Sequence, residues 1–173
     1  MTEQKDYPTL FKSFQIILQS HPDYTLEIFG DGPDGPTLEE IALKMGIKEN
    51  VTFHGAQKDA ILQAADARCY VLSSKYEGMP NALMEAMAAG LPCVSTDCPN
   101  GPAELIEHGR NGLLVPVGDS AKLAEAMLKM IEDTAFAENC GKEAKKILET
   151  HSIDVKAKEY MDYIIKICDG DKA

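Results

Sequence analysis

The chain has 173 residues, 45 % of them hydrophobic, which suits one globular domain with a single core. The 17 Lys and Arg residues against 28 Asp and Glu residues give a formal net charge of −11, which argues against nonspecific binding to nucleic acid or to an anionic membrane. The sequence has no apolar run long enough to span a bilayer, and its first residues lack the pattern of a signal peptide. We therefore expect a cytoplasmic, globular chain.

Helix-like and strand-like segments alternate along the sequence. Apolar residues at helical spacing predict a helix over 7–20, alternation predicts a strand over 24–30, and Pro36 and Gly46 bound the next helix. The same signals predict, in order, strand 51–55, helix 58–65, strand 68–74, a helix from Asn81, strand 91–96, helix 102–108, strand 111–117 and helices 119–132, 134–150 and 153–168. Helices between strands indicate right-handed βαβ units and a parallel sheet covered on both faces. The predicted fold class is α/β, Rossmann-like and doubly wound.

Both ends of the chain differ from a typical doubly wound domain. Such a domain opens with a strand, whereas this chain enters a helix almost at once, so we expect its first strand to be missing. The segment from about 119 to 173 is helical and charged. We expect it to wrap the outside or to pack against a part that is not present.

Cysteine and histidine usage gives no sign of a metal site. The cysteines form no CxxC pair, and the histidines are scattered without the spacing of metal ligands. This favours reduced, mostly buried thiols over zinc or disulfide roles. The residues concerned are Cys69, Cys93, Cys98, Cys140, Cys168, His21, His54, His108 and His151.

Three loops follow predicted strands, at the sheet edge where α/β proteins bind ligands. They are GDGPDGP (30–36), SSKYEGMPN (73–81) and TDCPNGP (96–102). A tight turn alone explains the glycines of the first loop, with Asp31 and Gly32 shaping it.

The middle loop predicts an abrupt helix start. Pro80 favours an extended Met79, and Asn81 is a favoured N-cap residue next to the flexible Gly78. The unpaired amides and the positive end of such a helix can bind a phosphate.

Two glutamates flank this helix start. Glu85 is the only charged or polar side chain from Ala82 to Gly90, and burial of an unpaired carboxylate is costly. Glu85 therefore lies on a narrow solvent-exposed stripe or has a hydrogen-bond partner, and a favourable interaction with the helix dipole is its structural alternative. For Glu77 the structural alternative is a solvated loop side chain. The functional hypothesis is that both glutamates accept hydrogen bonds from hydroxyls of a nucleotide sugar, which combines a diphosphate with polyols.

Residues 77–97, EGMPNALMEAMAAGLPCVSTD, resemble the E-x7-E signature of retaining glycosyltransferases of family 4, which have the two-domain GT-B fold. The similarity extends through QKDYPTLFKSF, LEIFGDGP, VTFHG, AADARCYVLSSKYEG and PNGPAELIEHGRNGLLVPVGD, and so covers nearly the whole chain. It covers only the C-terminal half of such an enzyme. The resemblance implies that residues 1–173 form the nucleotide-sugar-binding domain and that the N-terminal acceptor domain is absent.

The resemblance also implies roles for individual residues. Lys5 and Glu77 would be catalytic, with Lys5 neutralising the leaving diphosphate and Glu77 binding the donor sugar. Glu85 would bind the ribose hydroxyls. We interpret His54 as a structural histidine and not as a catalytic base. The backbone would contribute the remaining donor contacts, to the nucleobase from His54 and Gly55 and to the diphosphate from Gly78, Met79, Pro80, Asn81 and Ala82.

The intact enzyme would transfer a hexosyl group from a UDP- or GDP-linked sugar to a glycan or lipid-linked acceptor, with retention of configuration. Placed cations and a helix end can stabilise the leaving diphosphate, so we expect no metal and no cofactor. The expected partners are the donor, the acceptor and the missing N-terminal domain, but no nucleic acid. The resemblance further implies work in polysaccharide assembly and permits peripheral attachment of the intact enzyme to the inner face of the membrane.

The family's arginine, which acts together with the lysine, would fall ahead of Met1, so we expect the chain alone to transfer no sugar. Two other hypotheses stay open, a nucleotide-sugar-binding module without chemistry and a sugar-nucleotide epimerase of the GT-B type. Consumption of an acceptor distinguishes the transferase from the epimerase. The sequence does not determine the nucleotide, the sugar, the acceptor or the oligomeric state.

Overall fold

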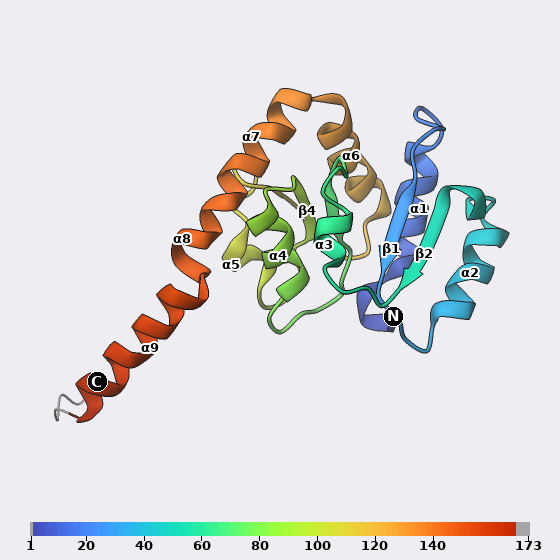
Figure 1. The fold of residues 1–173 in the computed structure, drawn as a ribbon. Coiled ribbons are helices and arrows are strands. Elements are labelled where there is room, and N and C mark those ends of the chain that lie inside the picture. The colour runs from blue at the N-terminus through green and yellow to red at the C-terminus, as the bar shows by residue number, and fades with distance from the viewer. Residues whose placement is uncertain (1, 169–173) are drawn as a thin grey trace.

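The computed structural model describes residues 2–168 and shows strands and helices in alternation, as predicted (Figure 1). The strands are β1 (Leu26–Phe29), β2 (Val51–Gly55), β3 (Tyr70–Leu72), β4 (Cys93–Thr96) and β5 (Leu113–Val115). The helices are α1 (Tyr7–Ile17), α2 (Gly35–Lys44), α3 (Ala60–Gln63), α4 (Asn81–Ala89), α5 (Pro102–Leu105), α6 (Ser120–Glu132), α7 (Thr134–Ala144), α8 (Leu148–His151) and α9 (Ile153–Cys168). Three 3-10 helices are η1 (Glu3–Lys5), η2 (Lys48–Asn50) and η3 (Lys145–Ile147), and the last of them interrupts the helix predicted over 134–150.

The strands form two parallel sheets, which corrects the prediction of one continuous sheet. β1 pairs with β2, and β4 lies between β3 and β5. Within residues 2–168, β1 and β3 therefore each have a single strand neighbour. In the doubly wound strand order 3-2-1-4-5-6 the first strand lies between the second and the fourth, and the break between β1 and β3 falls at that position.

Helices cover the two sheets differently. Every residue of β4 is buried. Val94 packs with buried residues of α6 and Cys93 packs with buried residues of α4, so this sheet has helices on both faces. In the β1–β2 sheet the apolar face meets α1 and α2, whereas Glu27 and Thr52 on the other face are exposed. The prediction of helices on both faces is thus correct for β3–β5 and wrong for β1–β2, because the outer face of β1–β2 carries polar side chains.

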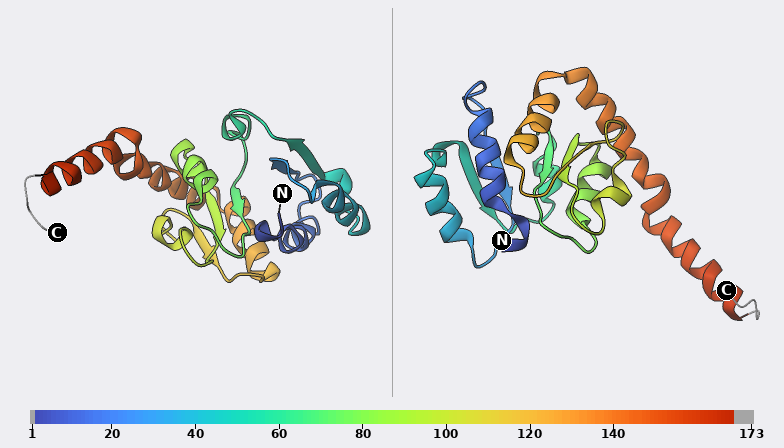
Figure 2. Two further views of the ribbon diagram at one scale, coloured as in Figure 1. Left: turned by 90° about the horizontal axis from the view of Figure 1, so that it is seen from below. Right: turned by 180° about the vertical axis from the view of Figure 1, so that it is seen from behind.

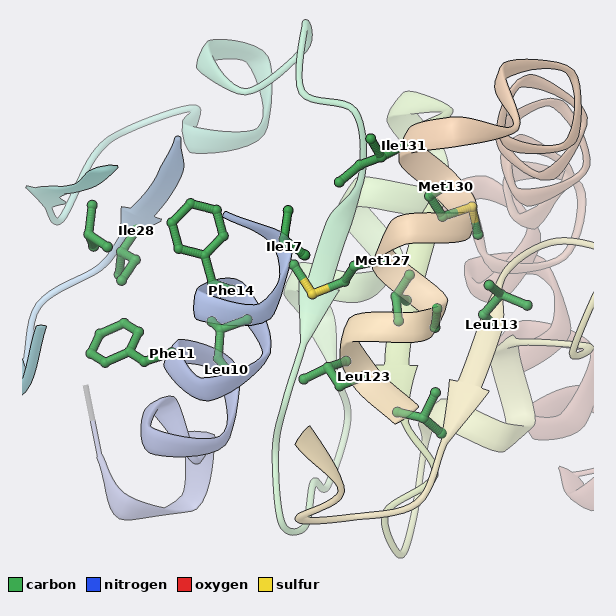
Figure 3. Close-up of a cluster of buried hydrophobic side chains, with 14 of the residues drawn as sticks. Leu10, Phe11, Phe14, Ile17, Ile28, Leu113, Leu123, Met127, Met130 and Ile131 are labelled. Carbon is green, nitrogen blue, oxygen red and sulfur yellow. The ribbon is translucent and has the colours of Figure 1, made fainter. Parts of the chain in front are cut away.

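Helix α1 joins the two sheets in one core. Figure 3 shows Phe11 and Phe14 on the side of Ile28, whereas Leu10 and Ile17 point toward α6. Apolar residues of α1 at helical spacing thus serve both sheets at once. This arrangement fixes the segment ahead of α1 relative to the strand ends, which matters for the site.

The C-terminal helices correct a second prediction. Helix α6 is part of the core, because Leu123, Met127 and Met130 are buried, and α7 buries Cys140 and Ala144. Their charges lie on the outer stripes of amphipathic helices, so the expectation that these helices only wrap the outside is wrong. Helix α9 alone extends away from the domain (Figures 1 and 2), and all of its residues from 156 to 168 are exposed. None of the helices within residues 2–168 has both the length and the apolar content needed to cross a membrane.

Candidate functional site

The loops after β3 and β4 lie side by side, as their position at the ends of neighbouring parallel strands requires. The hydroxyl of Thr96 donates to the carbonyl of Ser74 at 2.6 Å, and the amide of Glu77 donates to the carbonyl of Pro99 at 3.3 Å. The structure therefore brings together two of the three loops that the sequence singled out. The third loop follows β1 in the other sheet, where Gly30 bonds to Gly55.

The segment ahead of α1 is fastened across the loop that follows β3. The side chain of Gln4 donates to the carbonyl of Tyr76 at 2.8 Å, and the amide of Lys75 donates to the carbonyl of Gln4 at 2.8 Å. The hydroxyl of Ser73 donates to the carbonyl of Lys5 at 2.6 Å. These three bonds place the side chain of Lys5 directly at the carboxyl end of β3.

Glu77 is buried beneath this segment and is ion-paired. Its side chain is only 6 % exposed, and its Oε1 lies 2.8 Å from Nζ of Lys5 and 2.6 Å from Oγ of Ser74. The structural alternative of a solvated Glu77 is wrong, because the loop turns the side chain inward under Lys5. The other oxygen, Oε2, has no hydrogen-bond partner within residues 2–168. Every fully buried side-chain oxygen in this range does have a partner, so Oε2 is at least partly accessible. It is free to accept a hydrogen bond from a ligand.

The start of α4 leaves several amides open. The N-cap residue is Pro80, whose side chain has no acceptor, so the prediction of Asn81 as N-cap is wrong; the helix already includes Asn81. The exposed residues Gly78, Met79 and Ala82 make no backbone hydrogen bond through their amides within the described chain. These unpaired amides and the positive end of a helix without a capping side chain form an arrangement that can bind anions.

Glu85 lies on the exposed stripe of α4, which agrees with one of the two alternatives drawn from the sequence. It shares this stripe with Ala82 and Ala89, whereas Leu83 and Met87 on the opposite side are buried. No hydrogen bond or ion pair within residues 2–168 involves its carboxylate. The helix therefore carries Glu85 without any burial of an unpaired charge.

Tyr70 links the surroundings of the two glutamates. Burial is the main cause that raises the pKa of Tyr70 well above its ordinary value, and the charges of Glu77 and Glu85 are among the further causes. Both carboxylates thus act on the phenol of Tyr70, the first residue of β3. Neither Tyr70 nor Ser74 was a candidate from the sequence, because a hydroxyl in an apolar strand or a serine pair carries no motif of its own.

His54 and Gly55 end β2, in the sheet next to this group. The Nε2 atom of His54 lies 2.5 Å from Oε2 of Glu27, and its ring stacks on Phe29 with a centroid distance of 4.5 Å. A partnered and stacked ring agrees with a structural histidine. No contact within the described residues joins His54 or Gly55 to Lys5 or Glu77.

Two other features are less suited to a polar ligand. A hollow of about 610 Å³ lies between α1 and α6, but its walls are apolar side chains and the exposed charges of α6, with no buried polar group. The residues between 2 and 168 contain no group of three or more His, Cys, Asp or Glu side chains that is placed to hold a metal ion. Among the described residues, buried polar side chains and unpaired amides converge at Lys5, Glu77 and the start of α4.

Comparisons with known proteins point to one protein family. The sequence profile of the family described as glycosyl transferases group 1 matches residues 1–147. An exopolysaccharide phosphotransferase of Streptomyces coelicolor is 33 % identical over 168 residues, which are 96 % of this chain and 18 % of that protein.

Solved structures show the same fold. HepE of Anabaena, in complex with UDP and glucose, superposes with a TM-score of 0.85 at 25 % identity, over 96 % of this chain and 46 % of that one. A mutant of TarM from S. aureus, in complex with fondaparinux, alpha-GlcNAc-glycerol and UDP, gives a TM-score of 0.88 at 22 % identity, over 94 % of this chain and 33 % of that one. The chain thus spans less than half the length of each of these relatives.

Proposed function

Because this chain belongs to the glycosyl transferases group 1 family and has the α/β fold of GT-B enzymes, we propose that it is the donor-binding half of a hexosyltransferase. The donor is a UDP- or GDP-linked sugar, and the intact enzyme transfers the sugar to a glycan or lipid-linked acceptor with retention of configuration. Residues 1–173 then form one nucleotide-sugar-binding domain that works in the cytoplasm in polysaccharide assembly.

The observation that carries this proposal is the convergence of three kinds of group at one place. A cation (Lys5), a buried carboxylate (Glu77) and the open amides at the start of α4 lie at the carboxyl ends of the strands. A nucleotide sugar can use all three groups. Cations and amides bind its diphosphate, and charged acceptors bind its hydroxyls. The surrounding protein is acidic, so binding of the diphosphate depends on these local groups.

Lys5 and α4 suit the diphosphate. The ammonium of Lys5 has three N–H groups, of which the pair with Glu77 uses one, and its side chain is 39 % exposed. It can therefore hold Glu77 and a phosphate oxygen together. The amides of Gly78, Met79 and Ala82 and the positive end of α4, with Pro80 and Asn81 shaping that end, add donors for charge that grows as the diphosphate leaves. This chemistry needs no metal ion.

The glutamates suit the hydroxyls. Oε2 of Glu77 can accept a hydroxyl of the donor sugar, while Lys5 and Ser74 hold Oε1 in place. The exposed carboxylate of Glu85 is placed one helical turn beyond the diphosphate seat and binds the ribose. The backbone of His54 and Gly55 borders the nucleobase.

The missing N-terminal domain is the main protein partner in this proposal. The relatives are more than twice as long as this chain, and α9 exposes several large apolar side chains. In a longer protein the acceptor domain would cover them, a preceding strand would fill the break between β1 and β3, and a second cation would join Lys5. The chain alone transfers no sugar.

Two alternatives share the same site. A binding module would hold the nucleotide sugar without chemistry, and an epimerase would use Glu77 and Glu85 as acid and base without consuming an acceptor. The family match over residues 1–147 and the EGMPN loop at 77–81 favour the transferase. The phosphotransferase activity in the name of the Streptomyces relative belongs to a protein of which this chain matches 18 %, and we do not assign it to this chain.

Calorimetric titration of the folded chain with UDP and with GDP, in the presence of a chelator, tests the proposal. We expect saturable binding of one of the two nucleotides. Absence of binding both by this chain, shown to be folded by circular dichroism, and by a longer protein that includes the preceding segment would contradict it. Acceptor-dependent release of UDP or GDP by the longer protein then separates the transferase from the module and the epimerase.

A further inference from the structure

Gly101 lies against the start of α4 more closely than any other residue type would permit. It precedes α5, is buried, and has a φ of +98°, which disfavours a side chain. A β-carbon at Gly101 would lie 2.6 Å from Cδ and 3.0 Å from Cγ of Pro80, and 3.2 Å from the carbonyl oxygen of Gly78. Real β-carbons do not approach other atoms to 2.6 Å, so either Gly101 or the loop from Gly78 to Pro80 would have to move.

We propose that Gly101 is a positioning residue for the donor site, an inference that rests on the proposed function. The loop before α5 acts as the back wall that sets where Gly78 and Pro80 lie, and hence where the open amides of α4 point. Gly101 itself touches no ligand. Its role is to let the two loops approach until the amides and Glu77 share one ligand.

A hydrogen bond on the same wall supports this inference. The carbonyl of Pro99, two positions before Gly101, accepts the amide of Glu77 at 3.3 Å. The wall therefore contacts the site loop at both ends, at Glu77 and at Pro80. A shift of the wall changes the position of the carboxylate and of the helix start together.

The exposed side of the loop from Gly78 to Pro80 determines the direction in which the loop would move. Pro80 is buried and Leu83 behind it is fully buried, whereas Gly78 and Met79 are exposed. A β-carbon added at residue 101 would therefore push the exposed part of the loop into the ligand space, because the buried side cannot move without compressing the core. Loss of alignment of this kind lowers affinity without unfolding the domain.

The test compares Gly101→Ala with Gly109→Ala. Gly109 also has a positive φ, of +82°, but a β-carbon there meets no atom within 4 Å, so this control carries the backbone strain without the steric clash. A second variant, Pro80→Ala in the Gly101→Ala background, removes the two proline atoms that the new β-carbon meets. Rescue by this double variant is a result that general backbone strain would not produce.

Two measurements keep this inference separate from the proposed function. Backbone amide resonances need no nucleotide. We expect Gly101→Ala to shift those of Glu77, Gly78, Met79, Asn81 and Ala82, and Gly109→Ala to leave them in place. In the Pro80→Ala background the same Gly101→Ala substitution should shift them much less, with the Pro80→Ala single variant as the reference. UDP or GDP affinity should fall roughly ten- to a hundredfold in Gly101→Ala and stay unchanged in Gly109→Ala. Unchanged resonances of residues 77–82 in a folded Gly101→Ala protein overturn the inference whether or not nucleotide binds. Shifted resonances without any nucleotide binding by the parent chain support the positioning role and count against the proposed function.

Discussion

Nζ of Lys5 lies 2.8 Å from Oε1 of Glu77, although the two residues are 72 positions apart in the sequence. The hydroxyl of Ser74 donates to the same oxygen. One partner comes from the segment ahead of α1 and the other from the loop after β3, so folding of the two sheets around α1 assembles the pair. The contact holds a cation and a carboxylate together at the point where the donor diphosphate and the donor sugar meet in our proposal.

Replacement of Lys5 should affect both stability and binding. Lys5→Ala leaves Glu77, whose side chain is 6 % exposed, with Ser74 as its remaining hydrogen-bond donor. We expect the free energy of unfolding to fall by about 1–3 kcal/mol and nucleotide affinity to fall as well. Urea denaturation and calorimetric titration measure the two effects.

Lys75→Ala is the matched control for this variant. Lys75 pairs with Glu3 between the same two segments at 3.0 Å, but Glu3 is 91 % exposed, so this ion pair contributes little. Loss of the Lys75–Glu3 pair should leave the free energy of unfolding and the nucleotide affinity nearly unchanged. Equal effects of the two substitutions would show that the Lys5–Glu77 pair has no special role.

Replacement of Glu85 should affect binding alone. Glu85 is exposed and has no partner within residues 2–168, so Glu85→Gln should change the free energy of unfolding by less than about 0.5 kcal/mol. If the carboxylate binds ribose hydroxyls, nucleotide binding should weaken by about 1–3 kcal/mol. Glu138→Gln, at another exposed helical glutamate, is the control and should change neither. A large drop in melting temperature for Glu85→Gln alone would instead mark a structural carboxylate.

Stability should decline in alkaline solution. Burial raises the pKa of the Cys69 thiol from 9.0 to about 12, against a smaller opposing effect of Arg68. The unfolded thiol loses its proton near pH 9 and the folded one only near pH 12, so the contribution of Cys69 is complete below pH 9 and is lost as the pH rises toward 12. Burial raises the pKa values of Tyr70 and Cys93 in the same direction.

The pH effect can be assigned by comparing slopes. Above pH 9 the free energy of unfolding should fall less steeply with pH in Cys69→Ala than in the parent chain, by up to about 1.4 kcal/mol per pH unit. Cys168→Ala, at an exposed cysteine, should leave the slope as it is. Urea denaturation of the three proteins at a series of pH values gives the slopes. Parallel slopes for all three would refute the assignment to Cys69.

Removal of α9 should leave the domain stable. Of the described residues, a variant that ends at Ser152 loses only 153–168, which are exposed or partly exposed, so we expect its free energy of unfolding to stay within about 1 kcal/mol of that of the full chain. The full chain should self-associate at high concentration through the apolar side chains of α9, and the shorter one should not. Sedimentation velocity measures the association. The apolar side chains concerned are Ile153, Tyr160, Met161, Tyr163, Ile164, Ile165 and Ile167.

Ile164→Glu in the full chain is the matched single substitution. It places a charge on the exposed surface of α9 and keeps the helix. It should reduce association as the deletion does. Loss of more than about 2 kcal/mol of stability on deletion would mean that α9 packs on the domain in solution.

Local sequence signals were sufficient for most of the fold. Helical periodicity, β-alternation and the bounding prolines and glycines predicted the order of strands and helices. The break in the sheet could not be predicted in this way, because a local pattern specifies a strand but not its neighbour. The burial of α6 was missed for a related reason, since charges on its outer stripe obscured the apolar stripe.

The sequence named candidate site residues but did not predict the contacts between them. Glu77, Glu85 and Lys5 were chosen from a motif and a resemblance, but nothing local indicates that Lys5 and Glu77 meet. Their contact depends on how α1 packs between the sheets. The N-cap of α4 was misplaced by one residue, because the preference of asparagine for caps is weaker than the constraint that Pro80 imposes on the chain.

The most direct test of the proposed donor site is a titration of the isotopically labelled chain with UDP and with GDP, followed through its backbone amide resonances. We expect saturable shifts at Gly78, Met79, Ala82 and Glu85, with further shifts near Gly55, for the nucleotide that binds. Saturable shifts confined to the hollow between α1 and α6 would contradict a donor site at the start of α4. So would the absence of shifts at millimolar nucleotide both in this folded chain and in a longer protein that includes the preceding segment.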